Sequence, residues 1–447
     1  MTAFHAYDIR GVYNKDFDKN DVYKVGFFLP TLLKTDKVLI GRDVRISSPE
    51  VYKYLCKGIC DAGADVYNAG LCTTPMVYWF TAKFDFDASV MITASHNGKE
   101  YNGLKVSRTG AKPVGYATGL GELEKMMNGE INISDKPGKI ITFDKAAEYI
   151  DFQKQFVPSK LSELNISIDC SNGMAGLIVK DIIGENHNYI FDTLDGTFPN
   201  HEANPLVPEN TVDIKKAVIE NNSDIGIIFD GDADRVMFID DRGEFISPDL
   251  IIAALGHYFV KKDSAEIKVL QDIRSSKAVG EYLKKLGKVD MNTWRVGRAF
   301  ASLKLDEIDA VYGGELAGHY YFKDFYHSDS AMMAMSILLD VVLQLKEDGI
   351  SVSQLISNIR AYSNSGEINY KIENKQGAMD AVKSHFEGKE KVLKFMDFDG
   401  YRLEFADWWF NIRPSNTEPY LRLILEAKSD EMLAEKLEVI NDIIVNS

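Results

Sequence analysis

Short apolar runs recur along this chain and alternate with longer amphipathic stretches. Runs of a few residues between polar turns are typical of buried strands, and stretches with an apolar residue every three or four positions are typical of helices that cover a sheet. The clearest runs lie at residues 38–40, 90–93, 166–168, 225–229 and 269–270. This alternation predicts an α/β protein built from βαβ units.

Polar breaks divide the pattern into four parts. They lie near Gly138, at residues 243–248 and at residues 363–366, where turn-forming residues interrupt the periodic segments. A chain of 447 residues also exceeds the roughly 250–300 residues at which a single core stops growing. We therefore expect three related α/β domains and a smaller C-terminal α+β domain, with boundaries at 1–145, 146–245, 246–363 and 364–447.

Two segments with apolar periodicity predict helices. Residues 331–345 are the most apolar, but Asp340 and Gln344 interrupt them, and the run is shorter than the ~18 residues that a membrane span needs. We expect a buried helix there and a terminal helix at 429–445. A weak similarity suggests that three domains open with the same kind of strand, at residues 38–41, 166–169 and 268–271.

Charge narrows the possible partners. The chain has 51 basic and 67 acidic residues and a net charge of -16, which disfavours nucleic acid and anionic membranes as partners. A small anion would still bind where Arg and Lys side chains converge, because net charge does not fix a local field. Residues 1–12 lack the apolar core of a signal peptide. We expect a cytoplasmic protein with reduced, buried cysteines.

A strand-like run leads into a turn that carries a hydroxyl. Residues 93–98 read Thr-Ala-Ser-His-Asn-Gly, so Ser95 lies just beyond the carboxyl end of a strand, where α/β sheets place their sites. A serine there could accept and return a phosphoryl group if a cation and nearby donors neutralise the phosphoryl oxygens. The alternative is that Ser95 and Asn97 only make turn hydrogen bonds.

Three carboxylates crowd the tip of a predicted hairpin. Asp230, Asp232 and Asp234 alternate with small residues between two apolar strands. Side chains at this spacing can point to one centre, and a hard divalent cation such as Mg²⁺ relieves their repulsion. A calcium EF-hand does not fit, because its sixth and twelfth positions would be Arg235 and Asp241. A merely solvated acidic turn, and a phosphatase with an Asp nucleophile, are the alternatives.

A cluster near the C-terminus has the chemistry of a phosphate cradle. It combines a guanidinium with hydroxyls, an amide and backbone donors from Arg413, Ser415, Asn416 and Thr417. A turn rich in cap residues is the alternative.

Two other regions offer groups for a sugar phosphate. Residues 313–319 place Glu315 and His319 on a glycine-rich loop, which suits gripping sugar hydroxyls and moving protons. Arg10 and Arg45, in two short segments near the N-terminus, could equally form surface ion pairs worth little free energy.

Taken together, these segments resemble the α-D-phosphohexomutase family, and most closely its bacterial phosphomannomutase and phosphoglucomutase members. The similar motifs occur in the family's order along the whole chain, which makes the match specific; they are residues 7–11, 41–43, 73–75, 93–97, 230–235, 314–319 and 413–419. The resemblance implies four domains around a central cleft. One domain each would supply a phosphoserine, a metal site, sugar specificity and a phosphate grip.

The resemblance also implies a role for each motif residue. Ser95 is the phosphoserine, and one of its phosphate oxygens binds Mg²⁺ together with Asp230, Asp232 and Asp234. The transfer site is lined by Arg10, His96, Lys105 and Arg235. Glu315 reads the sugar hydroxyls, and His319 and Lys105 are acid/base candidates. The phosphate that is not reacting binds to Arg413, Ser415, Asn416 and Thr417.

The sequence departs from the family pattern at three positions. Gly98 follows Asn97 where the family usually has proline, which would free the loop. Among the residues assigned to substrate binding, Ala317 replaces a serine and Arg298 replaces a histidine. These changes affect substrate details and not the reaction.

The activity that the resemblance implies is that of a phosphomannomutase. Mannose 1-phosphate and mannose 6-phosphate would interconvert through phospho-Ser95 and a hexose 1,6-bisphosphate, which also acts as activator, and glucose phosphates would react too. Phosphoglucomutase is an alternative, as is phosphoglucosamine mutase, although that branch usually has Gln where Leu316 stands. A non-catalytic phosphosugar-binding protein is the alternative of another class, and the intact Ser95 and acidic triad argue against it.

Overall fold

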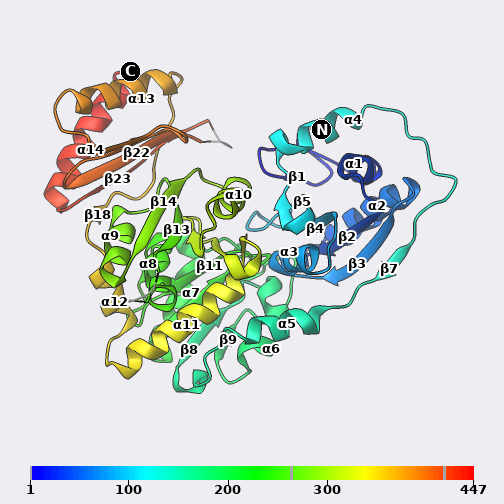
Figure 1. The fold of residues 1–447 in the computed structure, drawn as a ribbon, viewed down its shortest axis with the longest axis horizontal. Helices are drawn as coiled ribbons and strands as arrows, with labels where there is room; N and C mark the ends of the chain where they lie inside the picture. Colours follow the sequence, from blue (N-terminus) through cyan, green and yellow to red (C-terminus); the bar gives the residue numbers. More distant parts are fainter. Residues whose placement is uncertain (1–2, 262–264, 416–418) are drawn as a thin grey trace.

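The computed structural model describes residues 3–261, 265–415 and 419–447. These residues form four units, and Figure 1 shows them in an arc from the first unit, in blue, to the C-terminal unit, in orange and red. Each unit has its own sheet, so the predicted four-domain α/β architecture is confirmed. Within the described ranges, no helix combines the length and the apolar character needed to cross a membrane.

A mixed sheet forms the centre of the first domain. Its strands lie in the order β1 (Ile9–Val12), β5 (Tyr101–Arg108), β4 (Ala88–Ile92), β2 (Lys37–Arg42), β3 (Asp65–Leu71) and β7 (Ile140–Thr142), with β6 (Lys112–Pro113) paired to β5. The helices are α1 (Lys19–Leu33), α2 (Ser48–Asp61), α3 (Thr74–Lys83) and α4 (Leu120–Met126). Because β2 and β4 are parallel, the loops that follow them meet at one edge of the sheet.

The second domain contains the predicted acidic hairpin. Its strands lie in the order β12 (Phe245–Ile246), β11 (Val236–Ile239), β10 (Ile225–Phe229), β8 (Ile166–Asp169) and β9 (Asn188–Ile190). Strands β10 and β11 are antiparallel and pair Phe229 with Val236, which leaves the three aspartates at the tip. The helices are α5 (Ala146–Lys154), α6 (Val179–Ile183) and α7 (Val212–Glu220).

The third domain has a similar sheet and a long buried helix. Its strands lie in the order β14 (Val289–Trp294), β13 (Ile267–Asp272), β15 (Tyr312–Gly314), β16 (Tyr320–Phe322) and β17 (Ser328–Asp329). The helices are α8 (Pro248–Phe259), α9 (Lys277–Leu286), α10 (Arg298–Ile308), α11 (Ala331–Glu347) and α12 (Val352–Ile359). Helix α11 is buried along most of its length, which confirms the helix predicted there.

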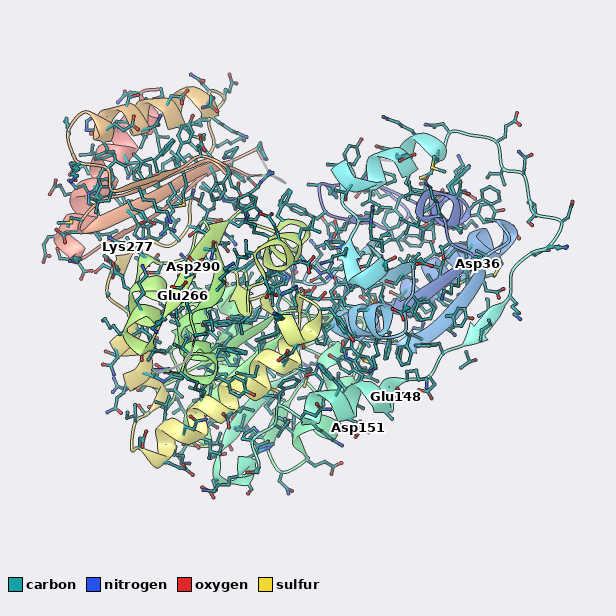
Figure 2. The ribbon with its side chains drawn as sticks, in the orientation of Figure 1. Asp36, Glu148, Asp151, Glu266, Lys277 and Asp290 are labelled. Atoms are coloured by element: carbon teal, nitrogen blue, oxygen red, sulfur yellow. The ribbon has the colours of Figure 1, made fainter. Side chains whose placement is uncertain are left out.

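The C-terminal domain is an antiparallel sheet covered by two helices. Its strands lie in the order β18 (Ser363–Asn364), β23 (Leu421–Ala427), β22 (Trp408–Pro414), β21 (Tyr401–Glu404) and β20 (Lys394–Met396), with β19 (Ile368–Tyr370) paired to β23. The helices are α13 (Lys375–Glu387) and α14 (Asp430–Val445), so the predicted terminal helix is confirmed. This domain has its own core and contacts the third domain, where Lys277, labelled in Figure 2, donates to Phe405 O at 3.1 Å.

The first three domains share the same turn at the end of one strand, which supports the predicted repeat. Strands β2, β8 and β13 each end at or next to an aspartate, Asp43, Asp169 or Asp272. The aspartate Oδ1 accepts a hydrogen bond from the backbone N–H two residues later, at 3.0, 2.7 and 2.7 Å respectively. Such an Asx turn reverses the chain directly after the strand. The three domains therefore leave corresponding strands in the same way.

Candidate active site

Loops from all four domains line one cavity of about 970 Å³. This volume suits a small ligand. Most of the predicted site residues are on its wall: Arg10, His96, Lys105, Asp234, Arg235, Arg298, Glu315, Ala317, His319, Arg413 and Ser415. Ser95, Asp230 and Asp232 are buried. Asp230 accepts from the wall residue Arg235, and Asp232 accepts from the wall residue Lys105. Asn416 and Thr417 fall outside the described residues.

Ser95 lies in a strained turn after β4. Its φ is +52°, in the left-handed region that residues with a Cβ seldom adopt and that is frequent at functional sites. Thr93 Oγ1 accepts a hydrogen bond from Ser95 N at 2.9 Å, and Ser95 Oγ donates to Asp230 Oδ2 at 2.8 Å. The turn therefore aims the hydroxyl at the acidic loop of the second domain.

The acidic loop approaches Ser95 closely because Gly231 has no side chain. A Cβ at Gly231 would lie 2.5 Å from Ser95 O. The three aspartates of this loop are at most 1% exposed, and they offer ligand atoms within 4.8 Å of one another. Asp232 Oδ1 and Asp234 Oδ1 accept no hydrogen bond from the described residues. Buried carboxylate oxygens without partners are costly, and they fit a hard cation.

Lys105 neutralises the other oxygens of the same aspartates. Its Nζ donates to Asp232 Oδ2 at 2.7 Å and to Asp234 Oδ2 at 2.5 Å. Burial alone would lower the pKa of Lys105, but the two aspartates outweigh burial and raise it. Burial, together with the charges of Asp234 and Asp232, raises the pKa of Asp230. The centre thus has an ammonium on one side and, on the other, carboxylate oxygens that accept no hydrogen bond from the described residues.

The loop between β15 and β16 holds His319 among carboxylates. His319 Nδ1 lies 3.0 Å from Glu315 Oε2, and His319 Nε2 lies 3.5 Å from Asp234 Oδ1. Burial and Arg235 disfavour the imidazolium, but Asp234 and Glu315 outweigh them and raise the pKa of His319 to about 9. Arg235 Nε donates to His319 Nε2 at 3.2 Å, so Nε2 acts as an acceptor in this structure. The raised pKa means that this nitrogen takes up a proton readily, as an acid/base group must.

Glu315 is engaged by the protein as well as by the cavity. Its Oε1 accepts from Gly297 N at 2.6 Å, and its Oε2 accepts from Tyr321 Oη at 3.1 Å in addition to the contact with His319. A carboxylate has about four acceptor positions, so three protein donors leave little capacity. Glu315 can therefore accept about one further hydrogen bond from a ligand.

Arg298 is fixed between two domains. Its Nε donates to Asp329 Oδ1 at 2.9 Å, its Nη2 donates to Ala111 O at 3.2 Å, and its guanidinium carbon lies 3.5 Å from the centroid of the Tyr78 ring. Tyr78 and Ala111 belong to the first domain, and Asp329 belongs to the third. Arg298 lines the cavity but is held at its wall.

Arg413 lies at the fourth-domain end of the cavity. It is 4% exposed, and its amino groups lie 3.8 Å from Asp399 and 4.0 Å from Glu367. Its Nε donates to none of the residues that the structure describes. Contacts this long leave guanidinium N–H groups for a phosphate.

Arg274 and Arg45 are important residues that sequence reasoning missed or misjudged. Arg274 lines the cavity and donates to Asp272 through Nε and Nη2, at 3.2 and 2.8 Å. The surface ion pair considered for Arg45 is wrong, because Arg45 is 1% exposed. Both arginines follow a strand in an Asp-x-Arg pattern, and that shared position was the available signal.

Comparisons with known proteins agree with this arrangement. Residues 1–130, 147–243 and 247–362 match the alpha/beta/alpha domains I, II and III of the phosphoglucomutase/phosphomannomutase family. Residues 367–443 match the C-terminal domain of the same family. The four domains follow the family's order.

Relatives and solved structures match over nearly the whole chain. The phosphomannomutase of Methanocaldococcus jannaschii is 35% identical over 449 residues, which cover 99% of this chain and 98% of the relative. The phosphomannomutase of Vibrio cholerae serotype O1 is 34% identical, with coverages of 99% and 98%. A phosphoglucomutase/phosphomannomutase family protein from Burkholderia thailandensis has a similar structure, with a TM-score of 0.86, 25% identity and coverages of 99% and 97%. The chain belongs to the phosphoglucomutase/phosphomannomutase family.

Proposed function

We propose that this protein is a phosphomannomutase that interconverts mannose 1-phosphate and mannose 6-phosphate and also accepts glucose phosphates. The observation that carries the proposal is the hydrogen bond of 2.8 Å from Ser95 Oγ to Asp230, which joins a strained serine turn to a buried acidic triad. A single cavity then connects this centre to Arg413. One end of the cavity suits phosphoryl transfer, and the other suits a phosphate that stays bound.

Magnesium fits the acidic triad. The donors are all hard oxygen atoms, and two of them, Asp232 Oδ1 and Asp234 Oδ1, accept no hydrogen bond from the described residues. Asp230, Asp232 and Asp234 would hold the ion together with an oxygen of phospho-Ser95. When bound, Mg²⁺ would neutralise charge on the transferring phosphoryl group.

Ser95 Oγ would carry the phosphoryl group between the two positions of the sugar. In the first half-reaction the substrate hydroxyl attacks the phosphorus, the Ser95 Oγ–P bond breaks, and a hexose 1,6-bisphosphate forms. The bisphosphate then reorients and returns its other phosphoryl group to Ser95 Oγ. A trace of the bisphosphate would therefore act as activator, because it phosphorylates the free serine.

The remaining residues of the transfer site divide the work of charge and protons. Arg10, Lys105 and Arg235 offer positive charge to the phosphoryl oxygens. His96 Nδ1 lies 3.4 Å from Ser95 Oγ, and burial, with Arg235 and Arg10, lowers the pKa of His96. A neutral imidazole there can take the Ser95 proton as the phosphoryl group returns. His319 and Lys105 are the acid/base candidates on the substrate side.

The sugar and its second phosphate would bind across the rest of the cavity. Glu315 would accept a hydrogen bond from the hydroxyl at position 3 or 4, which mannose and glucose share, and Arg298 and Ala317 would line the sugar. Arg413 and Ser415, with Asn416 and Thr417, would bind the phosphate that is not reacting. A bisphosphate that binds in two orientations discourages tight reading of position 2, so both epimers should react.

The mechanism is tested by Ser95→Ala. Wild-type protein incubated with glucose 1,6-bisphosphate should gain one phosphate by intact-mass analysis, and Ser95→Ala should gain none and lose turnover. Ser89→Ala, a buried serine of β4, is the matched control and should keep both properties. Full activity of Ser95→Ala would overturn the proposed mechanism. A wild-type protein that takes up phosphate but does not turn over would favour the non-catalytic phosphosugar-binding alternative.

The substrate assignment is tested separately. The values of kcat/KM for the 1-phosphates of mannose, glucose and glucosamine should be compared with Mg²⁺ and catalytic bisphosphate present. We expect a modest difference between mannose and glucose and a poor rate with glucosamine. A preference for glucose above about 100-fold, near 2.7 kcal/mol, would instead assign phosphoglucomutase.

A further inference from the structure

One buried guanidinium holds the backbone of the serine turn from the inside. Arg45 Nη2 donates to Ser95 O at 2.8 Å and to Asn97 O at 2.6 Å. Its Nη1 donates to Gly98 O at 2.6 Å and to Tyr101 O at 3.2 Å. The Arg45 side chain is 0% exposed. Four carbonyl groups of residues 95–101 thus share one side chain.

Arg45 is itself held by the first domain. Asp43 Oδ2 lies 3.1 Å from Arg45 Nε, and Asp43 Oδ1 accepts from Arg45 N at 3.0 Å and from Ser48 Oγ at 2.5 Å. Asp43 N donates to Ile92 O at 3.0 Å, so the pair is anchored to the end of β4. The guanidinium therefore cannot follow the serine turn if the turn moves.

The second domain covers the same guanidinium. The ring centroid of Phe198 lies 5.1 Å from Arg45 Cζ, within the range of a cation–π contact. The Arg45 backbone also forms a β-bridge with Gly196, and a Cβ at Gly196 would lie 2.3 Å from Val44 O. Arg45 thus lies where the first domain meets the domain that carries the acidic loop.

We propose that Arg45 is the positioning residue for Ser95, which fixes the strained turn so that the hydroxyl stays aligned with the acidic loop. The turn has two reasons to relax: Ser95 has a left-handed φ of +52°, and Gly98 gives the following backbone extra freedom. Hydrogen bonds to the carbonyl groups on both sides of His96 oppose that relaxation. Arg45 thus restrains the backbone of the turn, which Gly98 leaves free to move.

Only a planar fork with several donors can do this. A lysine at position 45 would keep the charge, but its three N–H donors on one nitrogen cannot reach carbonyl groups on both arms of the turn. Ser95 Oγ would then occupy a range of positions relative to the bound sugar phosphate. A misplacement of about 1 Å can cost roughly 10²-fold in rate, whereas binding of the phosphate at Arg413 does not depend on Ser95.

The inference is tested with Arg45→Lys in the full-length chain, and the kinetic part rests on the proposed function. We expect kcat to fall by roughly 10²-fold with KM changed by less than about threefold, because the lost alignment affects the transition state and not phosphate binding. Phosphorylation of Ser95 by glucose 1,6-bisphosphate, followed by intact mass, should slow by a similar factor. Amide hydrogen exchange in residues 93–101 should rise.

Arg402→Lys is the matched control. Arg402 is also fully buried and donates to two carbonyl groups, of Ile273 and Ser275, but it lies in the fourth domain. The Arg402→Lys variant should lower the melting temperature as much as Arg45→Lys does, but it should leave the amide exchange of residues 93–101 unchanged. The inference is overturned if Arg45→Lys keeps wild-type kcat and exchange, or if both variants raise the exchange of residues 93–101 equally. If wild type itself is not phosphorylated, the proposed function fails, and the exchange comparison still decides whether Arg45 holds the turn.

Discussion

Two buried groups of carboxylates in this protein are satisfied in opposite ways. In the acidic loop, Asp232 and Asp234 each accept a hydrogen bond from Lys105 with one oxygen, and the other oxygen of each accepts none from the described residues. At the seam between the third and fourth domains, Glu426 is also buried, at 4% exposure. Its oxygens accept from neutral donors, Ser276, Asn364 and Trp409, at 2.6 to 2.8 Å.

The difference shows what each group is built to hold. Carboxylates that converge need a cation when one ammonium cannot satisfy them all, and two of these buried oxygens accept no hydrogen bond from the described residues. A carboxylate surrounded by neutral donors can instead keep a proton. Burial and the nearby Asp249 raise the pKa of Glu426 to about 7, and burial also raises the pKa of Asp249. The acidic loop is therefore suited to bind a metal ion, and Glu426 is suited to bind a proton.

The largest effect should come from removing one ligand of the acidic triad. We expect Asp232→Asn to lower turnover by roughly 10³-fold, about 4 kcal/mol, because it removes a charged metal ligand and a partner of Lys105. Mg²⁺ at a hundred times its Kd should stabilise the wild type by about 2.7 kcal/mol and so raise its melting temperature. It should not raise the melting temperature of the variant.

Asp151→Asn is the control for this variant. Asp151 is an exposed carboxylate of α5 and is labelled in Figure 2 well away from the C-terminal domain. It should leave both turnover and the response to Mg²⁺ unchanged. If Asp232→Asn kept the wild-type thermal shift with Mg²⁺, the acidic loop would be structural.

The elements that could be predicted from the sequence are those whose signal is local. Strand β10, the acidic tip and strand β11 are contiguous, so one apolar run, one acidic turn and a second apolar run define the hairpin. The turn at Ser95 is equally local. The four-domain architecture followed from the same alternation and is confirmed, whereas the exact domain boundaries and the individual site roles stay predictions.

The contacts that could not be predicted join distant residues. Ser95 and Asp230 are 135 residues apart, and no pattern in either loop shows that they share a hydrogen bond. A surface position was one interpretation of Arg45, because charged residues are usually exposed. Its four carbonyl acceptors lie 50 to 56 positions further along the chain.

The second prediction moves from the anion-rich end of the cavity to its cationic end. Arg413→Ala should weaken binding of the substrate by about 2–4 kcal/mol, the scale of a lost charge-assisted contact. KM should rise more than kcat falls, since the phosphate at this end does not react. Lys428→Ala removes an exposed cation paired with Asp407 in the same domain and should change neither constant. Unchanged kinetics in Arg413→Ala would rule out the phosphate cradle.

The third prediction concerns the proton held at the seam. Glu426 has a folded-state pKa of about 7, above its ordinary value of 4.5. The folded protein therefore keeps a proton that the unfolded chain loses, and stability should fall as pH rises from 4.5 to 7. The fall attributable to Glu426 should be at most about 3 kcal/mol. In Glu426→Gln this fall should disappear from denaturant unfolding measured between pH 4.5 and 8.

Glu435→Gln is the control for the seam, because Glu435 is an exposed residue of α14. It should keep the wild-type dependence of stability on pH. An unchanged dependence in Glu426→Gln would mean that Glu426 is ionised in the folded protein throughout this range, and the contrast with the acidic loop would fail.

The smallest effect should come from removing one neutral donor at the seam. Asn364 Nδ2 donates to Glu426 Oε1 at 2.8 Å, and this hydrogen bond is stronger when Glu426 is ionised, because the acceptor then carries charge. For this hydrogen bond, Asn364→Ala should therefore cost about 1 kcal/mol of stability at pH 8 and less at pH 5. Since the removed donor favours the carboxylate, the folded-state pKa of Glu426 should rise further above 7, so the loss of stability extends to higher pH.

Unfolding of the single and double variants with Glu426→Gln at the two pH values separates these effects. Asn364 Oδ1 also accepts from Gly366 N at 2.6 Å, and losing that hydrogen bond costs the same at every pH. An equal total cost at pH 5 and pH 8 would therefore show that Asn364 acts on the strand end alone and not on the buried carboxylate.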